Sequence, residues 1–167
     1  MKNIGIYIFD HIEVLDFAGP FEVFSTASRV AKRANPDSEA PFNVVTIAES
    51  DKTVTARGQL LIKPSYTIAH HPKLDVLIVP GGDVTAELNK KPVIAWIEHQ
   101  AQHTQMIASV CTGAFLLGKA GLLAGKKATT HWEDIADLEH QFPDTDVIPD
   151  ARWVDEDPVI TSAGISA

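Results

Sequence analysis

The chain of 167 residues contains little sulfur and little positive charge. A single cysteine, Cys111, excludes a disulfide within the chain and is typical of a reducing compartment. Lys and Arg number 14 against 22 Asp and Glu, and the formal net charge of -8 argues against a basic face for nucleic-acid phosphates. No apolar run approaches the length of a membrane span, and the first residues lack a signal-peptide pattern. We therefore expect a cytoplasmic protein that binds neither membranes nor nucleic acid.

The cofactor and metal motifs that can be recognised in a sequence are also missing. Gly81-Gly82 lacks the further glycine of a dinucleotide fingerprint and the lysine of a P-loop. His99 and His103 have helical spacing, but no glutamate of a zinc-protease motif stands between them. We expect no cofactor and no metal.

The apolar content is sufficient for one buried core. Hydrophobic residues make up 45% of the chain and charged residues 22%, which predicts a single domain over residues 1–167. Predicted strands cover residues 4–9, 42–48, 74–79, 106–110, 127–130, 146–148, 152–154 and 159–161. One predicted helix begins near Pro20, and three others cover residues 92–103, 112–120 and 132–142. Residues 53–62 are expected to form a hairpin or extended excursion. This alternation predicts an α/β fold with a doubly wound, mostly parallel sheet and helices on both faces.

Cys111 stands where an apolar run ends and a helical pattern begins. A strand, a sharp turn and a helix would place its thiol in a crevice at the sheet edge, as in a nucleophile elbow. The helix N-terminus would favour thiolate over thiol there, and a lone cysteine in that setting is a candidate nucleophile or redox centre. The alternative is a small buried hydrophobe.

Two further segments end strands at the same predicted edge. Asp16 lies among apolar neighbours, where burial would raise its carboxyl pKa and suit it to acid–base catalysis; the alternative is a cap of the helix that begins near Pro20. Gly81 and Gly82 leave room for a ligand. The backbone N–H groups of Gly82 and Thr112 could hold developing negative charge.

Two side chains beside this edge have both structural and functional interpretations. Thr112 could donate a hydrogen bond to the site, or bond to the backbone at the start of its helix. His131 follows a short predicted strand and could orient or protonate a substrate, or serve as a structural histidine at a helix start.

Four segments together resemble the ThiJ/PfpI superfamily, part of the class I glutamine amidotransferase-like group. They are residues 14–20, 79–82, 108–113 and 128–132, and the resemblance extends over essentially the whole chain. It implies a flavodoxin-like fold and a homodimer. Within the superfamily the chain is most similar to isocyanide (isonitrile) hydratase and to the ligand-sensing domain of AraC-type regulators, since both carry elements like Ser-Val-Cys-Thr-Gly and Thr-Thr-His-Trp.

The hydratase resemblance implies a role for each matching residue. The nucleophile matches Cys111, the acid/base aspartate matches Asp16 and the site threonine matches Thr112. The reaction would turn an isocyanide into an N-substituted formamide. Gly81, Gly82, Thr112 and His131 are the expected substrate- or oxyanion-binding residues.

Other members of the superfamily are less similar. Intracellular peptidases carry histidine directly after the cysteine, where this chain has Thr112, and the glyoxalase and chaperone branch has glutamate where Asp16 stands. The alternatives to the hydratase are a small-molecule sensor and a redox protein based on Cys111. The relatives begin a long helix near the end of this sequence, which predicts that the domain lacks that helix and that one sheet face is exposed or covered by a partner subunit.

Overall fold

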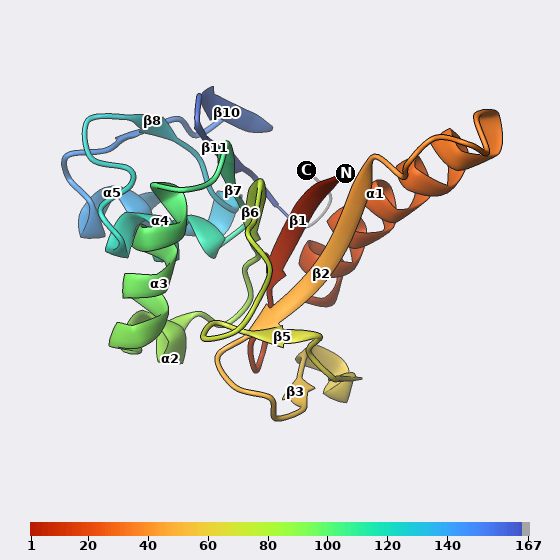
Figure 1. The fold of residues 1–167 in the computed structure, drawn as a ribbon. Helices are drawn as coiled ribbons and strands as arrows, with labels where there is room; N and C mark the ends of the chain where they lie inside the picture. The colour runs from red at the N-terminus through yellow and green to blue at the C-terminus, as the bar shows by residue number, and fades with distance from the viewer. Residues whose placement is uncertain (165–167) are drawn as a thin grey trace.

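A seven-stranded, mostly parallel sheet organises the structure, a computed structural model that describes residues 1–164 (Figure 1). Its strands, in spatial order, are β10 (Trp153–Glu156), β11 (Val159–Ser162), β7 (Met106–Val110), β6 (Val76–Val79), β1 (Lys2–Tyr7), β2 (Phe42–Ala48) and β5 (Tyr66–Thr67). Only the β10–β11 pair of this sheet is antiparallel. The flavodoxin-like, doubly wound α/β fold predicted from the sequence is confirmed. Residues 165–167, part of the predicted chain-end segment, lie outside the described residues.

Strand β1 is the centre of the core. It pairs with β2 on one side and β6 on the other, and Ile4, Ile6 and Tyr7 are fully buried. A strand covered on both faces needs apolar residues at successive positions, and the sequence of β1 has them. Gly5 has no side chain because a Cβ there would overlap Leu74 and approach Ile47.

Helices cover the two faces of the sheet. Helix α1 (Val14–Ala34) packs on β1 and β2, whereas α4 (Gly113–Lys119) packs on β6 and β7. Figure 1 shows α1 alone on one side, with α2 (Thr85–Leu88), α3 (Lys91–Ala101), α4 and α5 (Ile135–Gln141) on the other. None of the helices in residues 1–164 is both long and apolar enough to cross a membrane.

The start of α1 differs from the prediction. The helix begins at Val14 instead of near Pro20, so Asp16 lies in its first turn and Pro20 lies inside the helix. Proline removes one hydrogen-bond donor, and a helix of 21 residues with a buried face tolerates that loss. Placing Asp16 in a loop before the helix was therefore wrong.

The shorter elements follow the predicted order with shifted ends. The expected hairpin is present as β3 (Val54–Thr55) and β4 (Leu61–Ile62), joined by the 3-10 turn η1 (Arg57–Gln59) with Gly58 at φ 70°. The helix expected over residues 132–142 divides into η2 (Trp132–Asp134) and α5. Strands β8 (Lys127–Ala128) and β9 (Asp146–Val147) pair in a small separate sheet. Strand β5 and helix α2 were not predicted.

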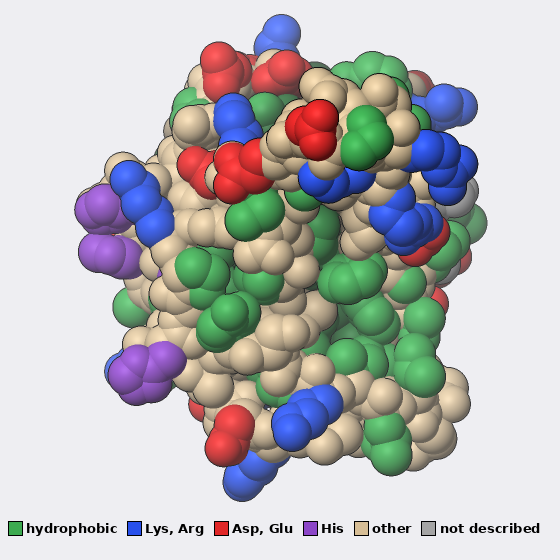
Figure 2. All heavy atoms as spheres, turned by 45° about the vertical axis from the view of Figure 1, so that its right-hand side comes forward, with side chains coloured by type: hydrophobic (Ala, Val, Ile, Leu, Met, Phe, Trp, Pro, Cys, Tyr) green, Lys and Arg blue, Asp and Glu red, His purple; other side chains and the backbone are tan. Residues whose placement is uncertain are grey.

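Apolar side chains remain open to solvent on and beside α1. Figure 2 shows hydrophobic side chains spread over the face that it brings forward, with Lys and Arg side chains at the upper right and also at the top, left and bottom. Leu15, Phe21, Val23 and Val30 of α1 are exposed. On the sheet, Ala108 and Ile160 are half-buried, whereas their neighbours Ile107 and Thr161 are buried.

Candidate functional site

Three loops meet at the carboxyl edge of the sheet and are joined by hydrogen bonds. The N–H of Glu13, before α1, donates to the Gly81 carbonyl after β6 at 2.9 Å. The N–H of Gly82 donates to Oγ1 of Thr112 after β7, also at 2.9 Å. The structure therefore brings together Asp16, Gly81, Gly82, Cys111 and Thr112.

Cys111 occupies a strained turn between β7 and α4. Its φ is 55°, a left-handed conformation that non-glycine residues seldom adopt. The Cys111 N–H donates to the carbonyls of Ser162 and Ala163, at 3.2 and 3.0 Å, and the Cys111 carbonyl accepts from Thr130 Oγ1 at 2.8 Å. These bonds on both sides hold the turn, which has the geometry of a nucleophile elbow.

The thiol differs from the sequence expectation in its protonation. Burial, with a smaller contribution from the nearby Asp16 carboxylate, raises the pKa of Cys111 to about 12, and hydrogen bonding from Thr112 opposes that rise. The side chain is only 7% exposed, and α4 is a short helix. The expectation that the thiolate is favoured over the thiol was therefore wrong, because burial and the Asp16 carboxylate disfavour the charged form.

Asp16 is fully buried and only half satisfied. Its Oδ2 accepts from the Gly81 N–H at 3.0 Å, whereas Oδ1 has no hydrogen-bond partner among the described residues. Burial raises the pKa of Asp16 to about 6, with the Gly81 bond opposing that rise and the Glu13 carboxylate adding to it. A carboxyl that titrates near neutral pH can both accept and donate a proton.

Most of the backbone N–H groups expected to hold negative charge already donate to other groups of the protein. The Gly81 N–H donates to Asp16, and the Gly82 N–H donates to the Thr112 hydroxyl. That hydroxyl in turn donates to the Gly82 carbonyl at 2.9 Å. Thr112 thus fastens the glycine turn to the elbow, and its side chain makes no cap bond at the start of α4. The predicted role of Gly82 as a free donor is not supported by this geometry, whereas the Thr112 N–H faces the sulfur.

A cavity of about 410 Å³ opens beside Cys111. Its lining residues are Glu13, Arg57, Gly82, Cys111, Thr112, His131, Glu133 and Asp134. The half-buried His131 fits both of its interpretations. It faces the cavity, and its Nδ1 accepts from the Glu133 N–H at 3.3 Å as the cap of η2.

Four charged lining residues were missed by the sequence analysis. Arg57 reaches the cavity from the β3–β4 hairpin and pairs with Glu13 at 2.7 Å. Asp134 lies 3.4 Å from His131, and Glu133 adjoins them in the sequence. The adjacency of Glu133 and Asp134 to His131 could have indicated their position, but no local signal connects Arg57 to Cys111. Within residues 1–164, no three His, Cys, Asp or Glu side chains are grouped to hold a metal ion.

Comparison with protein families agrees with this arrangement. The model of the DJ-1/PfpI family matches residues 2–167. Isonitrile hydratase of Pseudomonas putida is 35% identical over 167 residues, a match that covers 99% of this chain and 66% of the hydratase. The transcriptional regulator GbdR of Pseudomonas aeruginosa is 26% identical over 85% of this chain, but the match covers only 37% of the regulator. The chain thus spans about two thirds of the hydratase and a smaller part of the regulator.

Two further relatives extend the comparison. An uncharacterized protein from the cpoL 5′ region of Streptomyces lividans is 34% identical over 84% of this chain and 95% of its own length. A ThiJ/PfpI family protein from Pseudomonas syringae superposes with a TM-score of 0.82 at 30% identity, covering 99% of this chain and 63% of that one.

Proposed function

Since the chain belongs to the DJ-1/PfpI family, we propose that it hydrates an isocyanide to an N-substituted formamide, with Cys111 as nucleophile and Asp16 as acid/base. One observation carries the proposal. A thiol on a strained elbow lies in the electrostatic field of a buried carboxyl, one oxygen of which has no partner in the part of the chain that the structure describes. The similarity to isonitrile hydratase supports the choice of reaction.

The first step joins the sulfur to the isocyanide carbon. With a pKa of about 6, Asp16 is mostly ionised at neutral pH, whereas the pKa of about 12 keeps Cys111 protonated. Asp16 takes the thiol proton as Sγ bonds to the terminal carbon of R–N≡C, and then gives that proton to the same carbon. The product is a thioimidate, Cys111–S–CH=N–R.

Water completes the reaction and regenerates the thiol. Its oxygen bonds to the thioimidate carbon and one of its protons passes to nitrogen. The S–C bond then breaks as the hydroxyl proton returns to Sγ, and R–NH–CHO leaves. Atoms balance, and no oxidant or cofactor is consumed. His131 at the cavity wall is proposed to orient the substrate.

A second candidate is a sensor domain that binds a small molecule without turning it over. The raised pKa of Cys111 favours this alternative, because a protonated thiol is a weak nucleophile. The similarity to GbdR supports it as well. The same raised pKa weighs against the redox alternative, since peroxide reacts with thiolate.

The test is turnover of a panel of aryl and alkyl isocyanides, followed as formamide formation, with Cys111→Ala as control. Cys111-dependent turnover supports the hydratase. Folded wild-type protein that binds panel members at the Cys111 cavity without forming formamide favours the sensor.

The family resemblance also leads us to propose that the protein is a cytoplasmic homodimer made of this single domain. Light scattering of the purified chain tests the dimer.

A further inference from the structure

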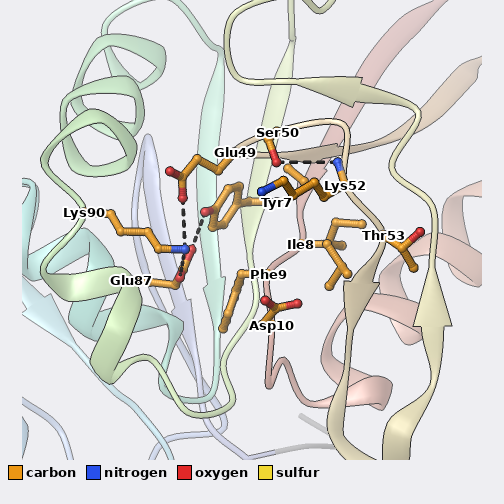
Figure 3. A pocket seen from close by; sticks show the side chains of 12 residues that line it. Tyr7, Ile8, Phe9, Asp10, Glu49, Ser50, Lys52, Thr53, Glu87 and Lys90 are labelled. Carbon is orange, nitrogen blue, oxygen red and sulfur yellow. Dashed lines mark hydrogen bonds and ion pairs between the residues drawn. The ribbon is translucent and has the colours of Figure 1, made fainter.

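A second cavity opens at the same sheet edge, beyond the ends of β1 and β2. Its volume is about 290 Å³, and none of its lining residues lines the Cys111 cavity. Figure 3 shows its walls: the chain that follows β1, the loop after β2 and the α2 region. The cavity is lined by Tyr7, Ile8, Phe9, Asp10, Ala48, Glu49, Ser50, Lys52, Thr53, Val54, Glu87 and Lys90.

One wall is a charge network, with Glu87 buried and Lys90 and Glu49 partly open to solvent, that the proposed hydration does not use. Glu87 is 2% exposed, accepts from the hydroxyl of the fully buried Tyr7 and pairs with Lys90 at 2.7 Å. Lys90 also pairs with Glu49 at 2.9 Å (Figure 3). Buried charge is costly unless it is paired, and here each member has its partner. The network therefore forms a rigid polar wall with one negative charge in excess.

The remaining two charged groups have no ion-pair partner among residues 1–164. Lys52 makes no side-chain hydrogen bond there, and Figure 3 shows it running across the cavity toward Tyr7. Asp10 lies on the side of Phe9, and its Oδ1 accepts only from the Thr55 N–H at 2.8 Å. Although both side chains line one cavity, they do not pair with each other. One ammonium and one carboxylate are therefore available to a ligand.

We propose that this cavity binds a small zwitterion, an amino acid, with its carboxylate on Lys52 and its ammonium group on Asp10. A molecule with both charges satisfies both groups at once, whereas a simple acid or amine leaves one unpaired. The Glu49–Lys90–Glu87 wall places its excess negative charge on the same cavity, which supports the ammonium group. Phe9 and Val54 line the cavity beside these charges, and the cavity volume suits a molecule of that size.

The experiment is calorimetric titration of the whole protein with each of the standard amino acids and with β-alanine, a panel of graded size. The tightest binder is then compared with its own decarboxylated amine and deaminated acid; for L-serine these are ethanolamine and 3-hydroxypropionate. We expect saturable one-to-one binding of the amino acid, and at least about tenfold weaker binding of each half-molecule.

Four matched variants locate the binding. Lys52→Met and Asp10→Asn remove one charge each, and asparagine keeps the oxygen that accepts from Thr55; each is expected to weaken binding at least about tenfold. Lys63→Met and Asp51→Asn remove exposed charges outside the cavity and are expected to leave the Kd unchanged, as is Cys111→Ala. The proposal is overturned if no panel member binds the folded protein, or if Lys52→Met and Asp10→Asn bind like wild type. It is equally overturned if either half-molecule binds as tightly as the amino acid.

Discussion

The two cavities at the carboxyl edge of the sheet differ in how completely the buried carboxyl group beside each is paired. Beside Cys111, the fully buried Asp16 has one oxygen with no hydrogen-bond partner within residues 1–164, and its charge acts on the thiol of the strained turn. Beside Tyr7, the buried Glu87 accepts from a hydroxyl and pairs with Lys90. A carboxyl oxygen without a partner can accept a proton, whereas a carboxylate with all its partners forms a rigid wall. The comparison teaches that one sheet edge holds both an incompletely paired buried carboxyl and a paired one.

The largest effect is expected from Asp16→Asn on turnover. The variant keeps the bond from Gly81 but cannot take the thiol proton, so isocyanide turnover should fall about 10²- to 10⁴-fold. The measurement is kcat/KM for formamide formation. Tyr7→Phe is the matched control in the second cavity, and its kcat/KM should equal that of wild type. Equal losses in both variants would contradict the separation of the two sites.

The same Asp16→Asn variant should gain stability at high pH. Because the folded pKa of about 6 exceeds the ordinary value of 3.8, ionised Asp16 destabilises the fold, and this cost grows as pH rises from about 4 to 6. Asn removes the cost, about 3 kcal/mol at most above pH 7. Urea unfolding should show the gain at pH 8 and none at pH 3.5. A pH-independent difference would show that Asp16 is not the titrating group.

A smaller, opposite effect is expected in the fully paired network. Tyr7→Phe removes the hydroxyl donor of Glu87 but leaves its pairing with Lys90, so the free energy of unfolding should fall by about 1.5 to 3 kcal/mol. Urea unfolding at pH 7 measures it, with Tyr66→Phe as control, since Tyr66 is exposed. No change would mean that the hydroxyl–carboxylate bond does not support the wall.

The smallest effect is expected at the mouth of the Cys111 cavity. The Arg57 side chain is 51% exposed and pairs with Glu13 in contact with solvent. Arg57→Met should therefore change unfolding free energy by less than about 1 kcal/mol. Thermal melts at low and high salt test this, with Arg29→Met as an exposed comparison. A loss of several kcal/mol would place Arg57 among the structural groups of the edge.

Local pattern was sufficient for the fold and for the elbow. An apolar run followed by small residues identified β7 and the turn at Cys111, and the Gly81-Gly82 turn was found in the same way. The start of α1 was missed because Pro20 was taken as a boundary, although the buried face of the helix maintains it from Val14. Burial around Cys111, which sets its protonation, depends on tertiary packing that no local pattern records.

Contacts between residues far apart in the sequence could not be predicted from local sequence patterns. Tyr7 and Glu87 are 80 residues apart, and Arg57 and Glu13 are 44 apart. Each pair forms only because a loop or hairpin returns to the sheet edge. Charged residues in such loops look like ordinary solvent-exposed positions in the sequence, so neither the Arg57–Glu13 pair nor the second cavity could be predicted.

The most direct test of the account is the mass of the intact protein during reaction with an isocyanide. Rapid acid quench should give a population heavier by the mass of the isocyanide, with the adduct on the peptide that contains Cys111. Asp16→Asn should accumulate less of it, and Cys111→Ala none. Formamide formation by a Cys111→Ala protein, or a wild-type protein that turns over substrate with no adduct at Cys111 at any quench time, would contradict the role of Cys111 as nucleophile.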